Sequence, residues 1–137
     1  MDKHKLKIAQ SDGVTLLCAE ASPSEAIAII QNVELRIGAK IFEVANAIIR
    51  GSTPLSWLQM AINATDINLK NVEIAASEGS CFIIWDKSIV DSVSLKNLVE
   101  CFDYYWYESC DDIFVVHVEK DEIYFIRHDG IIYKYGS

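Results

Sequence analysis

The C-terminal third of the chain restricts the fold most, because three apolar runs there are separated only by short polar turns. The runs cover residues 113–119, 123–127 and 131–135, and the turns are Lys120-Asp121-Glu122 and His128-Asp129-Gly130. β-Branched and aromatic residues dominate these runs, and such runs joined by short turns are typical of neighbouring antiparallel strands. The pattern predicts a C-terminal antiparallel β-meander.

Two helical patterns precede this meander. Ser22 is the N-cap, Pro23 the first helical residue and Glu25 the capping-box partner of a helix whose apolar positions recur at steps of three and four as far as Ile48. One helix over 23–50 would be about 42 Å long, so we expect a kink or break near Gly38, or else two separate helices. Further on, Ser92 or Ser94 caps a helix over 95–106, whose apolar stripe is Leu95, Leu98, Val99, Phe102, Tyr105 and Trp106.

The remaining segments complete the fold prediction. Apolar-rich runs at 5–10 and 14–19 flank a Ser-Asp-Gly turn and predict an N-terminal β-hairpin. Ser52-Thr53-Pro54 predicts a short helix that reaches Ile62, and residues 72–76 and 81–85 are short candidate strands. The expected fold is a single α+β domain over residues 1–137, with an N-terminal β-hairpin, a helical middle and a C-terminal antiparallel β-meander packed on helices.

The charge balance excludes several classes of partner. The chain has 20 acidic and 12 basic side chains, a formal charge of −8. Nucleic acids and anionic membranes would repel such a protein, so we expect neither as a partner. The apolar runs are far shorter than the roughly 18 residues of a membrane-spanning helix, and residues 8–13 contain Asp and Gly where a signal peptide needs an apolar core. A cytoplasmic location is therefore expected.

The sequence contains no complete catalytic or cofactor motif. No glycine-rich phosphate loop or dinucleotide fingerprint is present, and no spacing of His, Cys or Asp fits a common metal site, so we expect no cofactor and no metal. The densest group of reactive residue types is Cys110, Asp111, Asp112, His117, His128 and Asp129. His117 alternates with Ile113 and Val115 on one strand face, which favours a core histidine over a catalytic base. We therefore expect a protein that is not an enzyme, with a small Cys/His enzyme as a weaker alternative.

The negative charge is concentrated near the C-terminus, together with tyrosines. Residues 100–137 contain nine acidic and three basic side chains, a net charge of −6. The face of the 95–106 helix opposite its apolar stripe, together with the residues after that helix, supplies the candidate partner-binding residues: Glu100, Asp103, Tyr104, Tyr107, Glu108, Asp111 and Asp112. Tyrosine offers a large contact area at a small entropic cost, and carboxylates steer a basic partner. The alternative is a solvated charged face whose tyrosines cover the edge of the core.

Three of these acids also oppose the helix dipole. Glu108, Asp111 and Asp112 follow the predicted helix C-terminus, where negative charge costs about 0.3 to 1 kcal/mol per residue. Such acids point either to a functional requirement or to a structural partner, for which Arg127 is the candidate.

In length, acidity, lack of an export signal and lack of a catalytic motif, and in the patch from Glu100 to Asp112, the chain resembles bacterial immunity proteins of the contact-dependent growth inhibition type. The resemblance covers the general character of the chain and no signature motif. It implies a non-enzymatic inhibitor that binds a basic toxin domain, commonly a nuclease, through an acidic tyrosine-bearing surface. The alternative is an acidic intracellular adaptor or regulatory domain with a non-toxin partner, and the sequence does not indicate the oligomeric state.

Cysteine usage gives the first testable prediction. Cys18, Cys81, Cys101 and Cys110 form no C-x-x-C pair, and without an export signal they are expected to be reduced thiols. Thiol titration of protein denatured without reductant should find all four groups free. Two free groups would contradict the prediction and indicate a secreted, disulfide-bonded protein.

Overall fold

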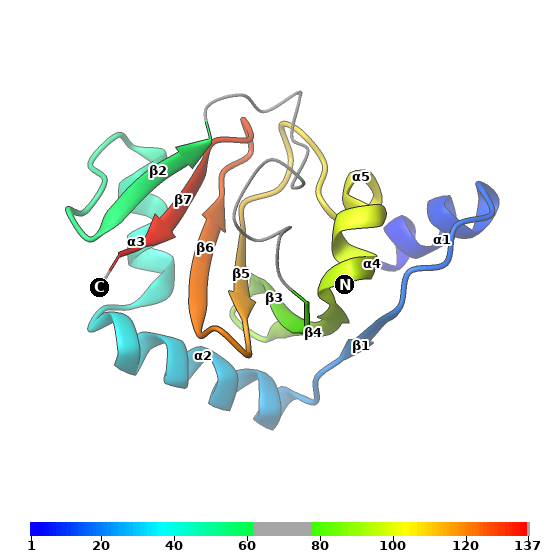
Figure 1. Ribbon diagram of the computed structural model, residues 1–137, viewed down its shortest axis with the longest axis horizontal. Helices are drawn as coiled ribbons and strands as arrows, with labels where there is room; N and C mark the ends of the chain where they lie inside the picture. Colours follow the sequence, from blue (N-terminus) through cyan, green and yellow to red (C-terminus); the bar gives the residue numbers. More distant parts are fainter. Residues whose placement is uncertain (62–77, 137) are drawn as a thin grey trace.

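A computed structural model describes residues 1–61 and 78–136, and the described strands all join one antiparallel sheet (Figure 1). The strands are β1 (Cys18–Glu20), β2 (Trp57–Ala61), β3 (Ser80–Asp86), β4 (Ile89–Ser94), β5 (Ile113–His117), β6 (Glu122–Ile126) and β7 (Ile132–Tyr135). Their order across the sheet is β1-β4-β3-β5-β6-β7-β2. The described helices are α1 (Lys3–Ser11), α2 (Pro23–Ile37), α3 (Ile41–Ile49), α4 (Leu95–Glu100) and α5 (Phe102–Tyr105). None of these helices has the length and apolar character needed to cross a membrane.

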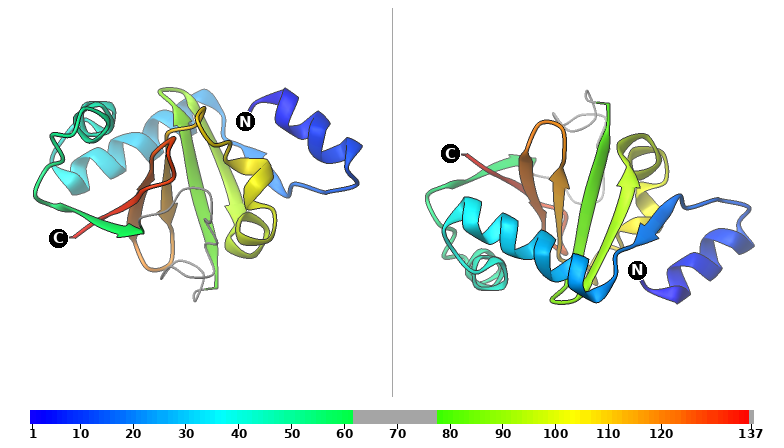
Figure 2. Two further views of the ribbon diagram at one scale, coloured as in Figure 1. Left: turned by 90° about the horizontal axis from the view of Figure 1, so that it is seen from above. Right: turned by 90° about the horizontal axis from the view of Figure 1, so that it is seen from below.

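The central strand β5 is buried on both faces, and this fixes the layering. All five of its side chains are buried. Because successive side chains of a strand point to opposite faces, Ile113 and Val115 join a core with α4 and α5, whereas Phe114 and Val116 join a core with α2 and α3. The sheet therefore lies between two helical layers (Figure 2), and the predicted α+β class is confirmed.

The predicted meander is confirmed. Strands β5, β6 and β7 are sequential antiparallel neighbours, with Ile113 opposite Ile126 and Phe125 opposite Tyr133. The predicted strand at 81–85 is also present as β3, which pairs with β5 on one side and β4 on the other. Strand β4 was not predicted, and the candidate strand at 72–76 lies outside the described residues.

The segment over 23–50 forms two separate helices, α2 and α3, which is one of the two predicted alternatives; the other was a single kinked helix. Ser22 Oγ accepts a hydrogen bond from the Glu25 N–H at 3.3 Å and donates one to Glu25 Oε1 at 2.7 Å, so the predicted N-terminus is correct. Gly38 ends α2 with φ of +68°, a left-handed conformation that glycine adopts without strain. The Glu34 carboxylate accepts a hydrogen bond from the Ile41 N–H at 2.9 Å, which caps α3 from the preceding helix.

The predicted 95–106 helix is divided at Cys101. Ser94 is its N-cap, and Leu95, Leu98, Phe102, Tyr105 and Trp106 are buried as the stripe predicts. Cys101, with φ of −114°, leaves the helical region, so the segment forms α4 and the single turn α5. The predicted buried face is therefore correct although the continuous helix is not.

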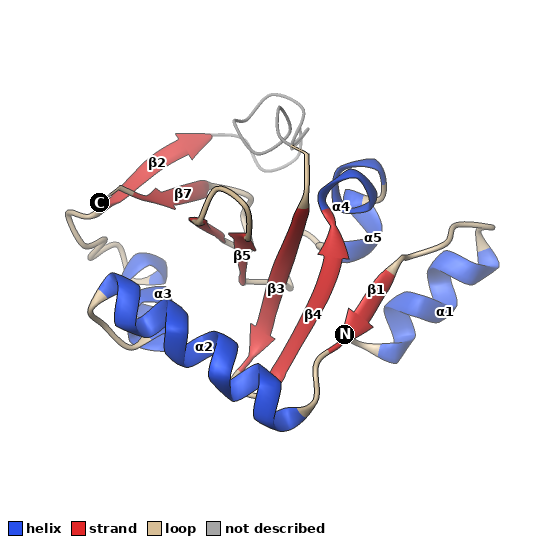
Figure 3. Ribbon diagram, turned by 60° about the horizontal axis from the view of Figure 1, so that its bottom comes forward, coloured by secondary structure: helices blue, strands red, loops and turns tan. Residues whose placement is uncertain are grey.

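The first arm of the predicted N-terminal hairpin is wrong, because residues 3–11 form α1. The Asp2 carboxylate caps this helix by accepting the His4 N–H at 2.9 Å, and Lys5 and Ala9, one turn apart, are its buried residues. The second arm does contain a strand, β1, but its partner is β4 (Figure 3). Burial of Lys5 depends on residues far along the chain, and the local sequence pattern therefore did not predict a helix here.

The predicted helix after Pro54 is also wrong, because the described part of that segment forms β2. Trp57 is 5% exposed and packs its ring against Phe114 and Tyr135, with ring centroids 5.9 and 5.5 Å apart. Leu55 and Leu58, which a helix would have buried beside Trp57, are 98% and 57% exposed. Pairing with β7 and burial of one indole therefore outweigh the helix-start signal.

Truncation of Phe102 tests the core that holds α5. Its ring is 5% exposed and stacks on Trp106 with centroids 5.8 Å apart. Phe102→Ala should lower the free energy of unfolding by about 3 to 5 kcal/mol, because it removes a packed ring and leaves a cavity. Urea unfolding measures the change, with the exposed neighbour Lys96→Ala as the control, expected within about 0.5 kcal/mol of the parent. A loss below about 1 kcal/mol for Phe102→Ala would contradict this packing.

Candidate functional site

The seven predicted partner-binding residues lie on α4, on α5 and in the loop that leads to β5, and they fall into two groups. Glu100, Asp103 and Glu108 are exposed. Tyr104, Tyr107, Asp111 and Asp112 are half-buried, and each of them contacts another part of the protein. The structure therefore separates surface charge from internal contacts, which the sequence could not do.

The three exposed acids carry uncompensated charge. Neither Glu100, Asp103 nor Glu108 forms an ion pair with a cation within residues 1–61 and 78–136. Exposed carboxylates of this kind contribute little to folding, and their charge is available to a partner.

Helix α1 adds an acid that the sequence analysis missed. It packs against α5 (Figure 1), and the Tyr104 hydroxyl donates a hydrogen bond to Asp12 at 3.0 Å. This hydrogen bond raises the pKa of Tyr104 above its usual value, because it stabilises the protonated hydroxyl. Asp12 was missed in the sequence analysis because this residue was expected in a hairpin turn. In the structure Asp12 is the C-cap of α1, and since α1 packs against α5, Asp12 lies beside Tyr104.

The buried cation Lys5 joins α1 to the rest of this region. Its side chain is 6% exposed, and Nζ forms an ion pair with Asp111 and donates a hydrogen bond to the Tyr105 carbonyl at 2.8 Å. The ammonium group also lies 4.4 Å from the ring centroid of Trp85 and 4.7 Å from that of Tyr107. Carboxylate, carbonyl and two aromatic faces replace the water that a buried ammonium group loses.

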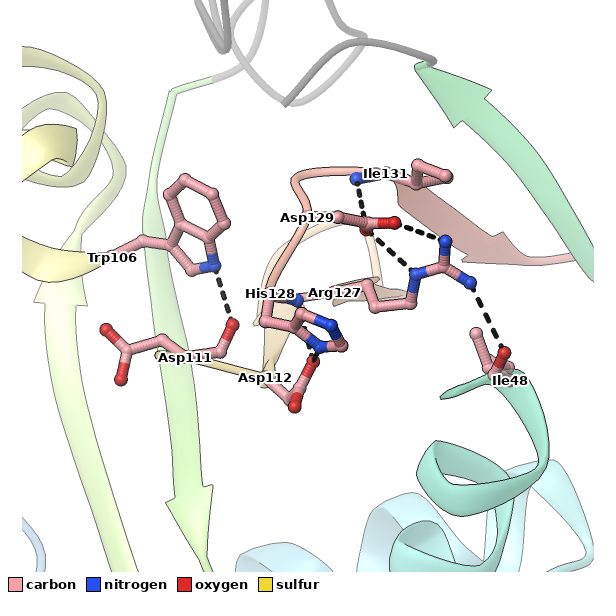
Figure 4. Close-up of polar contacts among 8 residues, drawn as sticks. All are labelled: Ile48, Trp106, Asp111, Asp112, Arg127, His128, Asp129 and Ile131. Atoms are coloured by element: carbon pink, nitrogen blue, oxygen red, sulfur yellow. Dashed lines mark hydrogen bonds and ion pairs between the residues drawn. The ribbon is translucent and has the colours of Figure 1, made fainter. Parts of the chain in front are cut away.

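The structure supplies direct partners for Asp111 and Asp112, whereas the hydrogen bonds and ion pair of Arg127 go to Asp129 and Ile48. Asp111 pairs with Lys5 and accepts the Tyr107 N–H at 2.7 Å. Asp112 accepts hydrogen bonds from the His128 N–H at 2.7 Å and from Nδ1 of its ring at 3.0 Å (Figure 4). Asp111 is thus paired with a cation and Asp112 is hydrogen-bonded within the fold, so both acids have structural partners.

Arg127 instead forms a separate cluster beside this region. Its Nε donates to Asp129 at 2.8 Å, its Nη2 pairs with the same carboxylate, and Nη1 donates to the Ile48 carbonyl at 3.4 Å (Figure 4). The hydrogen bonds from Arg127 lower the pKa of Asp129 below its usual value. This arrangement fixes the β6–β7 turn against the end of α3.

An acidic cleft adjoins Tyr107, which contacts the lining residues Lys5 and Asp111. It has a volume of about 570 Å³ and is lined by Met1, Asp2, Lys5, Trp85, Asp86, Ile89, Cys110, Asp111, Asp112 and Ile113. Asp2 and Asp86 are exposed and form no ion pair with a cation in the described residues. Below the cleft, Asp91 is 2% exposed in its side chain and binds Trp85 Nε1 and the Met1 amino group, each at 2.7 Å.

The exposed cations of α1 point away from this cleft. Lys3 and Lys7 are exposed, and each lies two residues from Lys5. At 100° per residue they are about 160° around the helix axis from the buried Lys5. Of the three lysines of α1, only Lys5 faces the cleft, where it is paired with Asp111.

Of the reactive residue types considered in the sequence, His117 is separated from the others, whereas Asp112 contacts His128 and Cys110 lines the cleft beside Asp111 and Asp112. His117 is 1% exposed and lies at the far end of β5, where Nδ1 accepts the Lys120 N–H at 3.0 Å and Nε2 is 3.1 Å from the Glu78 carbonyl oxygen. The four cysteines are free thiols, and burial raises the pKa of Cys18 and Cys101 and that of Cys81 to about 12. Within residues 1–61 and 78–136, no three His, Cys, Asp or Glu side chains are arranged to hold a metal ion.

Comparison of the chain with protein-family models, with curated proteins and with solved structures finds no match.

Substitution of Asp111 separates its structural role from partner binding. Asp111→Ala leaves the Lys5 ammonium buried without its counter-ion, so the free energy of unfolding should fall by about 3 to 5 kcal/mol. Urea unfolding measures this change. The control is Asp103→Ala, an exposed acid without an ion pair, which should alter stability by less than about 0.5 kcal/mol.

A double variant completes this test. In Lys5→Met with Asp111→Leu, both charges are replaced by apolar side chains, and much of the lost stability should return. Equal stability of Asp111→Ala and Asp103→Ala would show that the Lys5 ion pair does not support the fold.

Proposed function

We propose that the protein is a non-enzymatic immunity protein that binds and neutralises a basic toxin domain, of the nuclease class, in the cytoplasm. The observation that carries the proposal is the surface formed by the exposed acids Glu100, Asp103 and Glu108, the half-buried Tyr104 and Tyr107, and the adjoining acidic cleft. We call this the acidic tyrosine face. It combines unpaired negative charge with aromatic side chains that are already held in place by the fold.

Charge complementarity favours a nuclease domain as the partner. An enzyme that binds nucleic acid needs a cationic surface to neutralise phosphates. A protein with a net charge of −8 and unpaired carboxylates on one face attracts such a surface, and in occupying it competes with the substrate. Inhibition by this route blocks the partner's surface and needs no chemical reaction.

The contacts within the face assign different roles to its members. Glu100, Asp103 and Glu108 act mainly on the encounter, because exposed charges attract over distance and are screened by salt. Tyr104 is held by Asp12, and Tyr107 by the Lys5 ammonium, so their rings lose little freedom on binding. The rings therefore supply contact area that slows dissociation.

The first experiment concerns the partner itself. The reading frame directly upstream of this gene is expected to end in a basic toxin domain, and co-expression with the protein should restore the growth that this domain alone prevents. The purified pair should form a one-to-one complex in size-exclusion chromatography. An upstream frame without such a domain, or a domain that the protein neither binds nor neutralises, would contradict the proposal and favour an adaptor with another partner.

Rate measurements on that pair test the face. Asp103→Lys or Glu108→Lys should slow association about tenfold or more at low salt and flatten its dependence on ionic strength. Tyr104→Ala should leave association unchanged and speed dissociation, by a factor of about 30 where the ring is buried at the interface centre, equivalent to about 2 kcal/mol. Surface plasmon resonance at two salt concentrations measures both effects.

Two matched variants control for general effects. Glu43→Lys makes the same charge reversal on α3, in the opposite helical layer, and should change association much less than Asp103→Lys. Tyr104→Phe removes only the hydroxyl that binds Asp12 and should keep most of the slow dissociation. Equal effects of Glu43→Lys and Asp103→Lys would place the interface elsewhere.

A further inference from the structure

A second, smaller pocket lies in the other helical layer, between α2 and strands β3, β5 and β6. Its apolar wall is formed by Val33 of α2, Phe82 of β3, Val116 of β5 and Ile123 of β6. Arg36 of α2 and Asp121 of the β5–β6 turn lie at its rim. Figure 2 shows α2 lying across this face of the sheet, away from α4, α5 and the acidic tyrosine face.

The pocket is large enough for a small ligand. Its volume is about 160 Å³, and an apolar protein cavity of about 150 Å³ accepts benzene. Protein interiors are otherwise close-packed, so a hollow with apolar walls leaves contacts unmade that a ligand would provide. A branched aliphatic group of four or five carbons fits this space.

The rim carries one positive and one negative group. Arg36 Nη1 forms an ion pair with Asp121 Oδ1, and their side chains are 31% and 73% exposed. An ion pair this exposed contributes only about 0 to 1 kcal/mol to stability, so a ligand can rearrange it at little cost. Arginine has five N–H donors, and in this geometry most of them are free for a second carboxylate.

We propose that this pocket binds a small zwitterionic α-amino acid with a branched aliphatic side chain. The side chain lies between Val33, Phe82 and Val116, the carboxylate binds the Arg36 guanidinium, and the ammonium group binds the Asp121 carboxylate. The site is independent of toxin binding, because the sheet separates it from the acidic tyrosine face.

Charge balance selects a zwitterion over a simple anion or cation. A monocarboxylate on Arg36 would bring a second negative charge beside Asp121, in a protein whose net charge is already −8. A simple amine would bind Asp121 and place its positive charge beside Arg36. A zwitterion gives each rim group an opposite charge and leaves the net charge unchanged, so both members of the pair remain compensated.

Three probes of similar shape test the assignment by backbone amide NMR on isotope-labelled protein. Leucine carries both charged groups, isocaproate lacks the ammonium group, and isoamylamine lacks the carboxylate. Leucine should shift the amide signals of Val33, Phe82 and Val116, with a dissociation constant at least about tenfold lower than that of either analogue, because each analogue loses one charge-assisted contact.

Variants of the rim and wall complete the experiment. Arg36→Gln should weaken leucine binding about tenfold or more, whereas Arg50→Gln, the same change at the exposed residue that follows α3, should not. Asp121→Asn should weaken leucine but not isocaproate, and asparagine tolerates the φ of +55° at this turn. Ile29→Trp should abolish binding, because Ile29 is a half-buried lining residue and a larger ring there fills the pocket.

The proposal is overturned if isocaproate or isoamylamine binds as tightly as leucine. That result would show that the pocket accepts any apolar group of this size and does not recognise the two charged groups. It is also overturned if leucine shifts no pocket amide at millimolar concentration, or if Arg36→Gln and Arg50→Gln behave alike. Loss of toxin binding is not expected in any of these variants, so the failure of this site and the failure of the proposed function are separate results.

Discussion

A sheet that is apolar on both faces is the constraint on which the rest of the structure depends. With all five side chains of β5 buried, either face left uncovered would expose a row of large apolar groups to water. Helices α2 and α3 cover one face, and α4 and α5 cover the other. The acidic tyrosine face is therefore the outer side of one covering layer, and its position follows from the need to bury Ile113, Val115 and Tyr124.

The layer formed by α4 and α5 is joined to α1 by a contact between distant parts of the chain. Lys5 and Asp111 are 106 residues apart, and their ion pair holds α1 beside α5 under the rings of Trp85 and Tyr107. Asn97 reinforces this arrangement, since its side chain accepts the Leu17 N–H at 2.9 Å and donates to the Thr15 carbonyl at 3.2 Å. A buried charge is stable only when it is paired, so these contacts act together to position the N-terminal segment.

Sequence patterns predicted the elements whose signals are local and failed where a distant residue decides. The capping box at Ser22, the stop at Gly38 and the stripe from Leu95 to Trp106 depend on neighbours within a few turns, and the structure contains them. Residues 3–11 and β2 were misassigned because their state depends on Asp111 and Tyr135, far along the chain. The same limit applied to the site: sequence located the acids, but only the fold divides them into exposed and internally paired groups.

This division determines which acids can adapt to a partner. Asp111 and Asp112 line the cleft, and their partners Lys5 and His128 fix their positions, so changes there disturb packing before they alter recognition. Glu100, Asp103 and Glu108 face water without an ion pair, and surface positions of this kind accept new charge or size with little loss of stability. Under the proposed function, such freedom at the contact residues allows the protein to match one toxin and reject others. The inner acids thus hold the fold together beside the cleft, whereas the outer acids are free to vary with the partner.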